Sequence, residues 1–175
     1  MEILELINIG SRQLKDKNIS SHRLDSEILL SKALNKTREE LLINLNQKID
    51  FINVNHFNSL ILRRSSKEPI AYILKEKEFW SKNFLVDNNT LIPRPETELM
   101  VEKIVKIFKK KDIYVLDIGT GTGCILLSLL SELQKSKGIG IDISHKAIQI
   151  ALKNSKRHNL NHRTKFYIRS LDEIY

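Results

Sequence analysis

Three glycines alternate with threonines at positions 119–123, directly after one apolar run and directly before another. Side chains at the glycine positions would keep the backbone away from a bound ligand, and glycine removes them. A second strand-like run, Ile139-Gly140-Ile141, ends at an acid that can accept hydrogen bonds from ribose hydroxyls at the switch point of a parallel sheet. This order predicts a nucleoside-binding βαβ unit whose site contains Gly119, Thr120, Gly121, Thr122, Gly123 and Asp142.

The details of the loop favour S-adenosylmethionine over a dinucleotide. A dinucleotide site has the pattern G-x-G-x-x-G, whereas this loop reads G-x-G-x-G and places Cys124 where the third glycine would fall. Asp117, two residues before the first glycine, suits a cationic ligand and would repel a pyrophosphate. The plain alternative is a glycine-rich turn with no ligand, but strand, loop, helix and distal acid all occur here in the expected order.

Composition narrows the class of protein further. The 175 residues contain one cysteine, which excludes an internal disulfide and fits a reducing, cytoplasmic compartment. The first residues do not resemble a signal peptide, and the apolar runs are too short to cross a bilayer, so we expect no membrane association. The spacing of the five histidines indicates no metal site.

The net charge of +8 lies mostly in residues 91–175, which carry +6 of it. Such a surface can attract an acidic protein or RNA. However, no aromatic residues interleave with runs such as Lys109-Lys110-Lys111, and a solvated surface explains these lysines. We therefore expect no direct binding of nucleic acid.

Hydrophobic periodicity divides the chain into three regions with different predicted secondary structure. Residues 1–75 show successive helical stripes and a capping box formed by Thr37 and Glu40, which predicts a small helical bundle. Residues 76–95 contain a predicted β-hairpin, with strands at 78–80 and 84–86 around a turn at 81–83. Residues 96–175 begin with a helix that Thr97 could cap, and they hold strands near 113–118, 139–143 and 164–169 in alternation with helices. The predicted class is α/β, with a doubly wound, Rossmann-like parallel sheet that stops after its third strand.

Three runs resemble the S-adenosylmethionine-dependent protein-glutamine N5-methyltransferases that modify peptide-chain release factors, the HemK family. They are Leu24 to Leu30, Glu68 to Ile73 followed by Glu78 to Trp80, and Leu91 to Glu98, which reads LIPRPETE and is the most family-specific of the three. The resemblance implies a helical substrate-docking domain at 1–75, a hairpin linker at 76–95 and a partial methyltransferase domain at 96–175. It places the methionine moiety at Gly119 to Gly123, the ribose at Asp142, and a release factor as the protein substrate.

Two departures from the family pattern stand out. After the third strand the family usually has an acid followed by an apolar residue against the adenine, but here Ser170 takes the acid position and Leu171 the apolar one. Asp172 could replace the acid if the strand end shifted by two residues. The Asn-Pro-Pro-Tyr motif that holds the substrate amide does not occur in these residues. The sequence therefore resembles the N-terminal part of such an enzyme, and we expect these 175 residues alone to be inactive.

Two alternatives remain open from the sequence. The first is a related RNA or DNA amino-methyltransferase, which would share the cofactor loop; the helical N-terminal region and the LIPRPETE run argue against it. The second is a non-catalytic chain that only docks a partner. We further expect the helical bundle to stay ordered by itself, and the region of three strands to be poorly stable because a partial sheet leaves an open edge and an uncovered apolar face.

Overall fold

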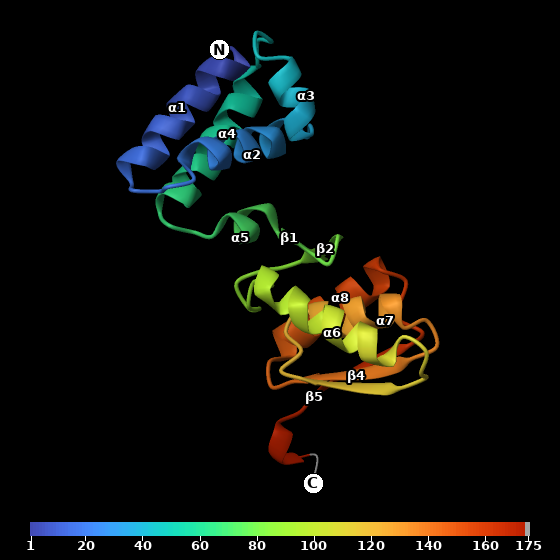
Figure 1. Cartoon of the computed structure of the whole chain (residues 1–175). Helices are drawn as coiled ribbons and strands as arrows, with labels where there is room; N and C mark the ends of the chain where they lie inside the picture. Colours follow the sequence, from blue (N-terminus) through green and yellow to red (C-terminus); the bar gives the residue numbers. More distant parts are fainter. Residues whose placement is uncertain (174–175) are drawn as a thin grey trace. The chain divides into compact units, whose positions relative to one another are not determined.

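The computed structural model describes residues 1–173. It divides into two compact units, Met1–Leu74 and the residues from Lys75 onward (Figure 1). The hairpin predicted as a linker lies within the second unit. Positions 174 and 175 of the predicted methyltransferase region lie outside the described residues.

The first unit contains five helices, as the helical stripes predicted. Their bounds are α1 Ile3–Asp16, α2 His22–Leu34, α3 Arg38–Ile43, α4 Phe51–Ser65 and α5 Ile70–Leu74. Thr37 and Glu40 form the predicted capping box at the start of α3, and Asn35 ends α2 in the left-handed conformation. The core combines leucines and isoleucines of α1, α2 and α4 with the fully buried Phe57.

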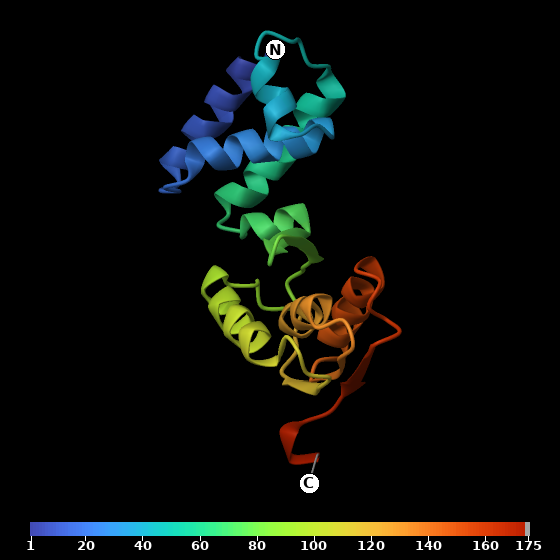
Figure 2. The same cartoon turned by 45° about the vertical axis from the view of Figure 1, so that its right-hand side comes forward.

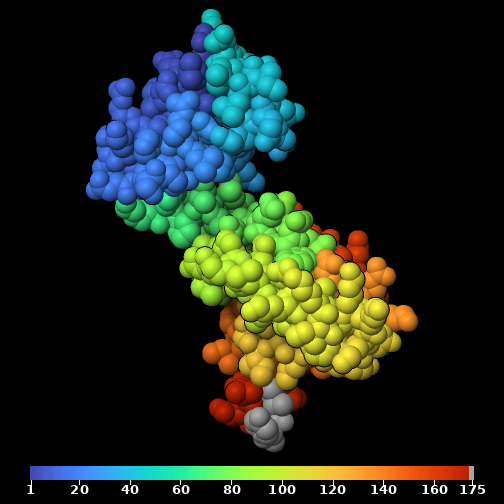
Figure 3. All heavy atoms as spheres, in the orientation of Figure 1, coloured from blue at the N-terminus to red at the C-terminus, as the bar shows by residue number. Residues whose placement is uncertain are grey.

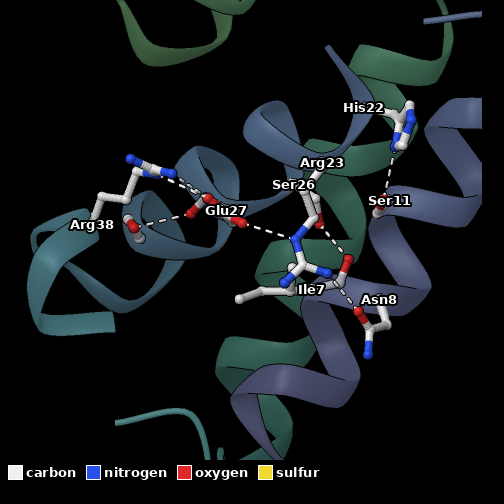
Figure 4. A network of polar contacts seen from close by, with 9 residues as sticks. Ile7, Asn8, Ser11, His22, Arg23, Ser26, Glu27 and Arg38 are labelled. Atoms are coloured by element: carbon white, nitrogen blue, oxygen red, sulfur yellow. Dashed lines mark hydrogen bonds and ion pairs between the residues drawn. The ribbon is translucent and has the colours of Figure 1, made fainter. Parts of the chain in front are cut away.

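Helix α2 also buries three consecutive polar residues, each paired with another helix, and Figure 4 shows the contacts of Ser26 and Glu27. Asp25 accepts a hydrogen bond from Nε of Arg64 at 2.7 Å, and the hydroxyl of Ser26 donates to the carbonyl of Ile7 at 2.9 Å. Glu27 binds the guanidinium groups of Arg23 and Arg38. Buried polar groups need such partners. The run that resembled a family signature therefore holds the helices of the bundle together.

The second unit begins with an antiparallel hairpin, β1 Glu76–Phe79 and β2 Lys82–Leu85. A short 3₁₀ helix, η1 Pro95–Thr97, leads into α6 Glu98–Phe108. Strands and helices then alternate, with β3 Tyr114–Ile118, α7 Cys124–Glu132, β4 Lys137–Asp142, α8 His145–Arg157, β5 Thr164–Ile168 and η2 Leu171–Glu173. The three later strands form a parallel sheet in the order β3-β4-β5, which confirms the predicted α/β class.

Helices α6, α7 and α8 lie on the same face of this sheet in both views, so within residues 1–173 the sheet lacks the second layer of helices that a doubly wound sheet has (Figures 1 and 2). Val101, Leu126, Leu127 and Leu130 form their buried core together with the hairpin's Phe79 and Phe84. The opposite face is exposed, and Tyr114 is 81% accessible and Leu116 49%. In the space-filling view α6 covers the front of this unit (Figure 3). Within residues 1–173, no helix has the length and apolar character that a bilayer crossing requires.

Two local predictions were wrong. The hairpin turns at Trp80 and Ser81, with φ of 53° and 52°, and Asn83, expected in the turn, instead pairs with Glu78. Side chains of two later helices hold this turn. Thr97 makes no side-chain cap, because it already has helical angles as the last residue of η1. Ser144 does cap α8, since its hydroxyl accepts the N–H of Ala147 at 3.2 Å.

Candidate cofactor-binding site

The glycine loop leaves the end of β3 and enters α7, as the sequence predicted. Gly119, Gly121 and Gly123 have φ of 71°, 54° and 77°, in the left-handed region that glycine adopts without strain. A methyl group added at Gly119 would meet no atom within 4 Å, so backbone conformation, not crowding, calls for glycine there. At Gly123, by contrast, an added methyl would lie 3.4 Å from Cβ of Ala151 in α8. The loop is therefore open at its first glycine and packed against α8 at its last.

Asp142 ends β4 and is hydrogen-bonded to the glycine loop. Its Oδ2 accepts the backbone N–H of Gly121 at 2.9 Å, and its Oδ1 accepts the N–H of Ser144 at 2.9 Å. A further bond from the N–H of Thr120 to the carbonyl of Ile141, at 2.9 Å, attaches the loop to the same strand. The structure thus brings the predicted ribose acid and the predicted methionine loop together at the carboxyl ends of two parallel strands.

A second acid lies beneath the loop. Oδ2 of Asp117 accepts the hydroxyl of Thr120 at 2.7 Å. Burial raises the pKa of Asp117, the bond from Thr120 lowers it in part, and the charge of Asp142 raises it further. A cation bound beside these carboxylates would favour the ionised form of Asp117 and would in turn be attracted by it.

Cys124 follows the loop as the first residue of α7 and is not suited to react. Burial raises the pKa of its thiol to about 11, and the charge of Asp117 adds to the effect. The thiol therefore stays protonated near neutral pH, and only a thiolate is a good nucleophile. Its contribution is to the core, where it packs with the leucines of α7.

Leu171, predicted to contact adenine, lies in η2 after β5 and is 47% exposed. The backbone N–H of Arg169 donates to the carbonyl of Asp142 at 3.1 Å, which ties the start of this segment to the end of β4. A hollow of about 500 Å³ lies on the bare face of the sheet, lined by residues such as Tyr114, Ile139 and Tyr167. None of the predicted cofactor residues lines it, and the adenine role of Leu171 stays a prediction.

Sequence reasoning missed the residues that hold the loop and hairpin from behind. Trp80 donates its backbone N–H to Glu98 at 2.8 Å and its Nε1–H to Glu132 at 3.0 Å, which fixes the unusual turn. Asn154 in α8 binds the backbone of both β2 and the glycine loop. Its position at the buried face of an amphipathic helix is the only signal the sequence carries, since an amide there must find partners.

The residues present fit a cationic nucleoside ligand. The loop exposes backbone at Gly119 and Gly121, and two carboxylates lie under and beside it. These carboxylates would repel a pyrophosphate, and they would favour ribose hydroxyls together with a positively charged group. The parallel strands, the loop after the first of them and the acid after the second define the class of nucleotide-binding α/β domains.

Comparisons with known proteins narrow that class to methyltransferases. The family described as PrmC N-terminal domain matches residues 5–74, and the family described as Methyltransferase domain matches residues 109–175. The chain belongs to the HemK family of release factor glutamine methyltransferases, as its sequence motifs predicted.

Curated relatives support this placement. A release factor glutamine methyltransferase of Buchnera aphidicola subsp. Baizongia pistaciae is 46% identical over 157 residues, which is 89% of this chain and 56% of that protein. One from Leptospira interrogans is 42% identical over 156 residues, 87% of this chain and 54% of that protein. A bifunctional methyltransferase of Rickettsia typhi is 34% identical, covering 92% of this chain and 35% of that protein. The chain thus spans about half the length of the release factor methyltransferases it matches.

Among solved structures, the N-terminal domain of human METTL16 superposes with a TM-score of 0.44 at 17% identity. The superposition covers 81% of this chain and 54% of that one.

Proposed function

We propose that this chain contributes the cofactor-binding part of a methyltransferase that transfers a methyl group from S-adenosylmethionine to a glutamine side chain of a peptide-chain release factor. The observation that carries the proposal is the glycine loop bonded to Asp142 within a chain that belongs to the HemK family. The names of the relatives support the choice of substrate.

The cofactor residues would act by position and charge. Backbone groups at Gly119 to Gly123 would contact the methionine moiety, and Asp117 would offer a negative charge to its cationic end. Asp142 would accept hydrogen bonds from the ribose, and Leu171 would lie against the adenine. S-adenosylmethionine supplies a methyl group activated by a sulfonium. These residues would orient that group but take no part in bond formation.

The acceptor chemistry sets a further requirement. An amide nitrogen is a poor nucleophile because its lone pair is delocalised into the carbonyl. Acceptors placed at its N–H groups raise the electron density on nitrogen and align it for attack. The Asn-Pro-Pro-Tyr motif that would supply these acceptors does not occur among the 175 residues. We therefore propose that catalysis requires residues in addition to these, and that the helical unit docks the release factor, in the cytoplasm.

The test is to express the chain with the reading frame that follows codon 175 and to supply it with a release factor and S-adenosylmethionine labelled in its methyl group. Label on one glutamine of the release factor, located by mass spectrometry, is expected. The matched control is Gly121→Val. A β-branched residue at φ 54° should distort the loop and abolish transfer without touching the helical unit.

Other outcomes separate the alternatives. Label transferred to RNA or DNA would favour the amino-methyltransferase alternative. A stop directly after codon 175, with cofactor binding absent and release factor binding retained, would favour a chain that only docks a partner.

A further inference from the structure

Asn154 lies in α8 and is fully buried. The hydrogen bonds of its side-chain amide go to residues outside this helix. Its Oδ1 accepts the backbone N–H of Leu85 at 2.7 Å, and its Nδ2 donates to the carbonyl of the same residue at 3.0 Å. Nδ2 also donates to the carbonyl of Thr122 at 2.9 Å. One side chain thereby joins the last residue of β2 to the glycine loop.

The bonds to Leu85 resemble those of a neighbouring strand, because both its N–H and its carbonyl are satisfied by one amide. Among residues 1–173, β2 pairs only with β1, and Asn154 completes the hydrogen bonding at its end. The chain then continues from β2 toward the LIPRPETE run, residues 91–98. Asn154 therefore anchors the end of β2 from which that segment departs.

The contact with the loop is reinforced one turn earlier on the same helix. Ala151 is fully buried, and its Cβ lies 3.4 Å from where a side chain at Gly123 would begin. Thr122, whose carbonyl Asn154 binds, is 2% exposed, and its hydroxyl accepts the N–H of Cys124 at 3.3 Å. Helix α8 thus supports the last part of the loop through one small residue and one amide.

We propose that Asn154 is a positioning residue for the cofactor site. By binding both the end of β2 and the glycine loop, it couples the position of the loop to that of the hairpin. Held through the carbonyl of Thr122, the loop keeps the conformation that presents Gly119 and Gly121 to a ligand. The inference rests on the proposed function, because it takes the loop to be the site for S-adenosylmethionine. An amide suits this task because only Asn or Gln offers two donors and an acceptor on one planar group.

The experiment compares Asn154→Ala with Ser155→Ala. Ser155 is the neighbouring residue on α8, is equally buried, and forms a side-chain hydrogen bond with Thr164 of β5, away from the loop. Binding of S-adenosylmethionine is measured by calorimetry and the free energy of unfolding by urea titration. Backbone hydrogen exchange is followed at Leu85 and across 120–123. Asn154→Ser serves if the alanine variant does not fold.

The expected result is a dissociation constant at least tenfold higher for Asn154→Ala, with faster exchange at Leu85 and in the loop together. Ser155→Ala should lower stability but change the dissociation constant by less than twofold. A folded Asn154 variant with unchanged affinity, or faster exchange at Leu85 alone, would overturn the proposal. If the wild-type chain binds no S-adenosylmethionine, the proposed function fails in this chain. In that case the hydrogen-exchange data alone test whether Asn154 couples Leu85 to the glycine loop.

Discussion

The carboxylate of Asp142 accepts the backbone N–H of Gly121 across 2.9 Å, while its other oxygen accepts the N–H of Ser144 at the start of α8. One side chain thus fixes both segments that leave the carboxyl ends of β3 and β4. Charged acceptors form the stronger class of hydrogen bond. The loop is therefore held before any ligand arrives, and Asp142 has a structural role besides the proposed contact with ribose.

Replacing Asp142 should affect binding and loop order together. Asp142→Ala removes the bond to Gly121 and the proposed ribose acceptor, and we expect affinity for S-adenosylmethionine to fall by roughly 1–3 kcal/mol. Hydrogen exchange at Gly121 should become faster in the absence of ligand. Calorimetry and exchange on the same sample test both effects. An unchanged affinity would remove Asp142 from the site.

Replacing Asp117 should change stability and cofactor binding in opposite directions. Because folding raises its pKa, its favourable contribution to stability is present while it is protonated and is lost as the pH rises through that folded-state pKa. Asp117→Asn removes this loss, so its free energy of unfolding should decline less than the wild type's from about pH 4 to pH 7. Binding of S-adenosylmethionine should weaken because the negative charge is gone. Identical pH dependence of unfolding in the two proteins would contradict this account.

The helical unit should lose stability in acid through Glu27. Burial raises the pKa of this carboxyl, but the hydrogen bonds from Arg23 and Arg38 outweigh burial and leave it below 4.5. Its contribution is therefore present above pH 4.5 and lost as the pH falls through the lower folded-state value. Glu27→Gln should destabilise the unit by about 1–3 kcal/mol at neutral pH and reduce its acid sensitivity. Exchange of α2 amides measures both, and Asp16→Asn on the exposed end of α1 is the control.

Arg163 should be important for the stability of the second unit. Its guanidinium donates to the carbonyls of Leu130, Leu133, Gln134 and Ser136 at 2.6 to 3.1 Å, and so caps the end of α7. We expect Arg163→Ala to lower the free energy of unfolding by about 2–3 kcal/mol, since several carbonyls lose a charged donor. Arg163→Lys should recover only part of this, because an ammonium cannot match the planar fork. Lys165→Ala on the exposed side of β5 should change little, and an equal loss there would count against the capping role.

The bare face of the sheet should make these 175 residues self-associate. Leu116 and Ile139 lie opposite each other in the register of β3 and β4, and both are exposed, as is Tyr114. The double substitution of Leu116 and Ile139 by Thr keeps the strand preference but should reduce association in sedimentation velocity. Leu99→Thr, on the exposed side of α6, is the matched control. Amides of α1 and α4 should exchange more slowly than those of β3 to β5; uniformly slow exchange in a monomer would refute the expected contrast.

The sequence by itself determined those features of the protein that depend on neighbouring residues in the chain. Alternating glycines predicted a loop whose backbone a ligand can approach, and the structure adds that all three have positive φ, a freedom that belongs to the residue itself. The capping box of Thr37 and Glu40 was equally local, and the apolar runs of the sequence indicated all three parallel strands. The family motifs identified the class of enzyme because each motif is contiguous in the chain.

Only the tertiary structure decided which groups hold these elements together. The partners of Asn154 and Arg163 are backbone carbonyls and N–H groups, which every residue carries, so no residue type along the chain announces them. The hairpin register was missed for a related reason, since Glu98 and Glu132 stabilise a turn at Trp80 that its own residues disfavour. Residue type and spacing thus located the loop and its acids, whereas the contacts that fix their positions arise from segments brought together only by folding.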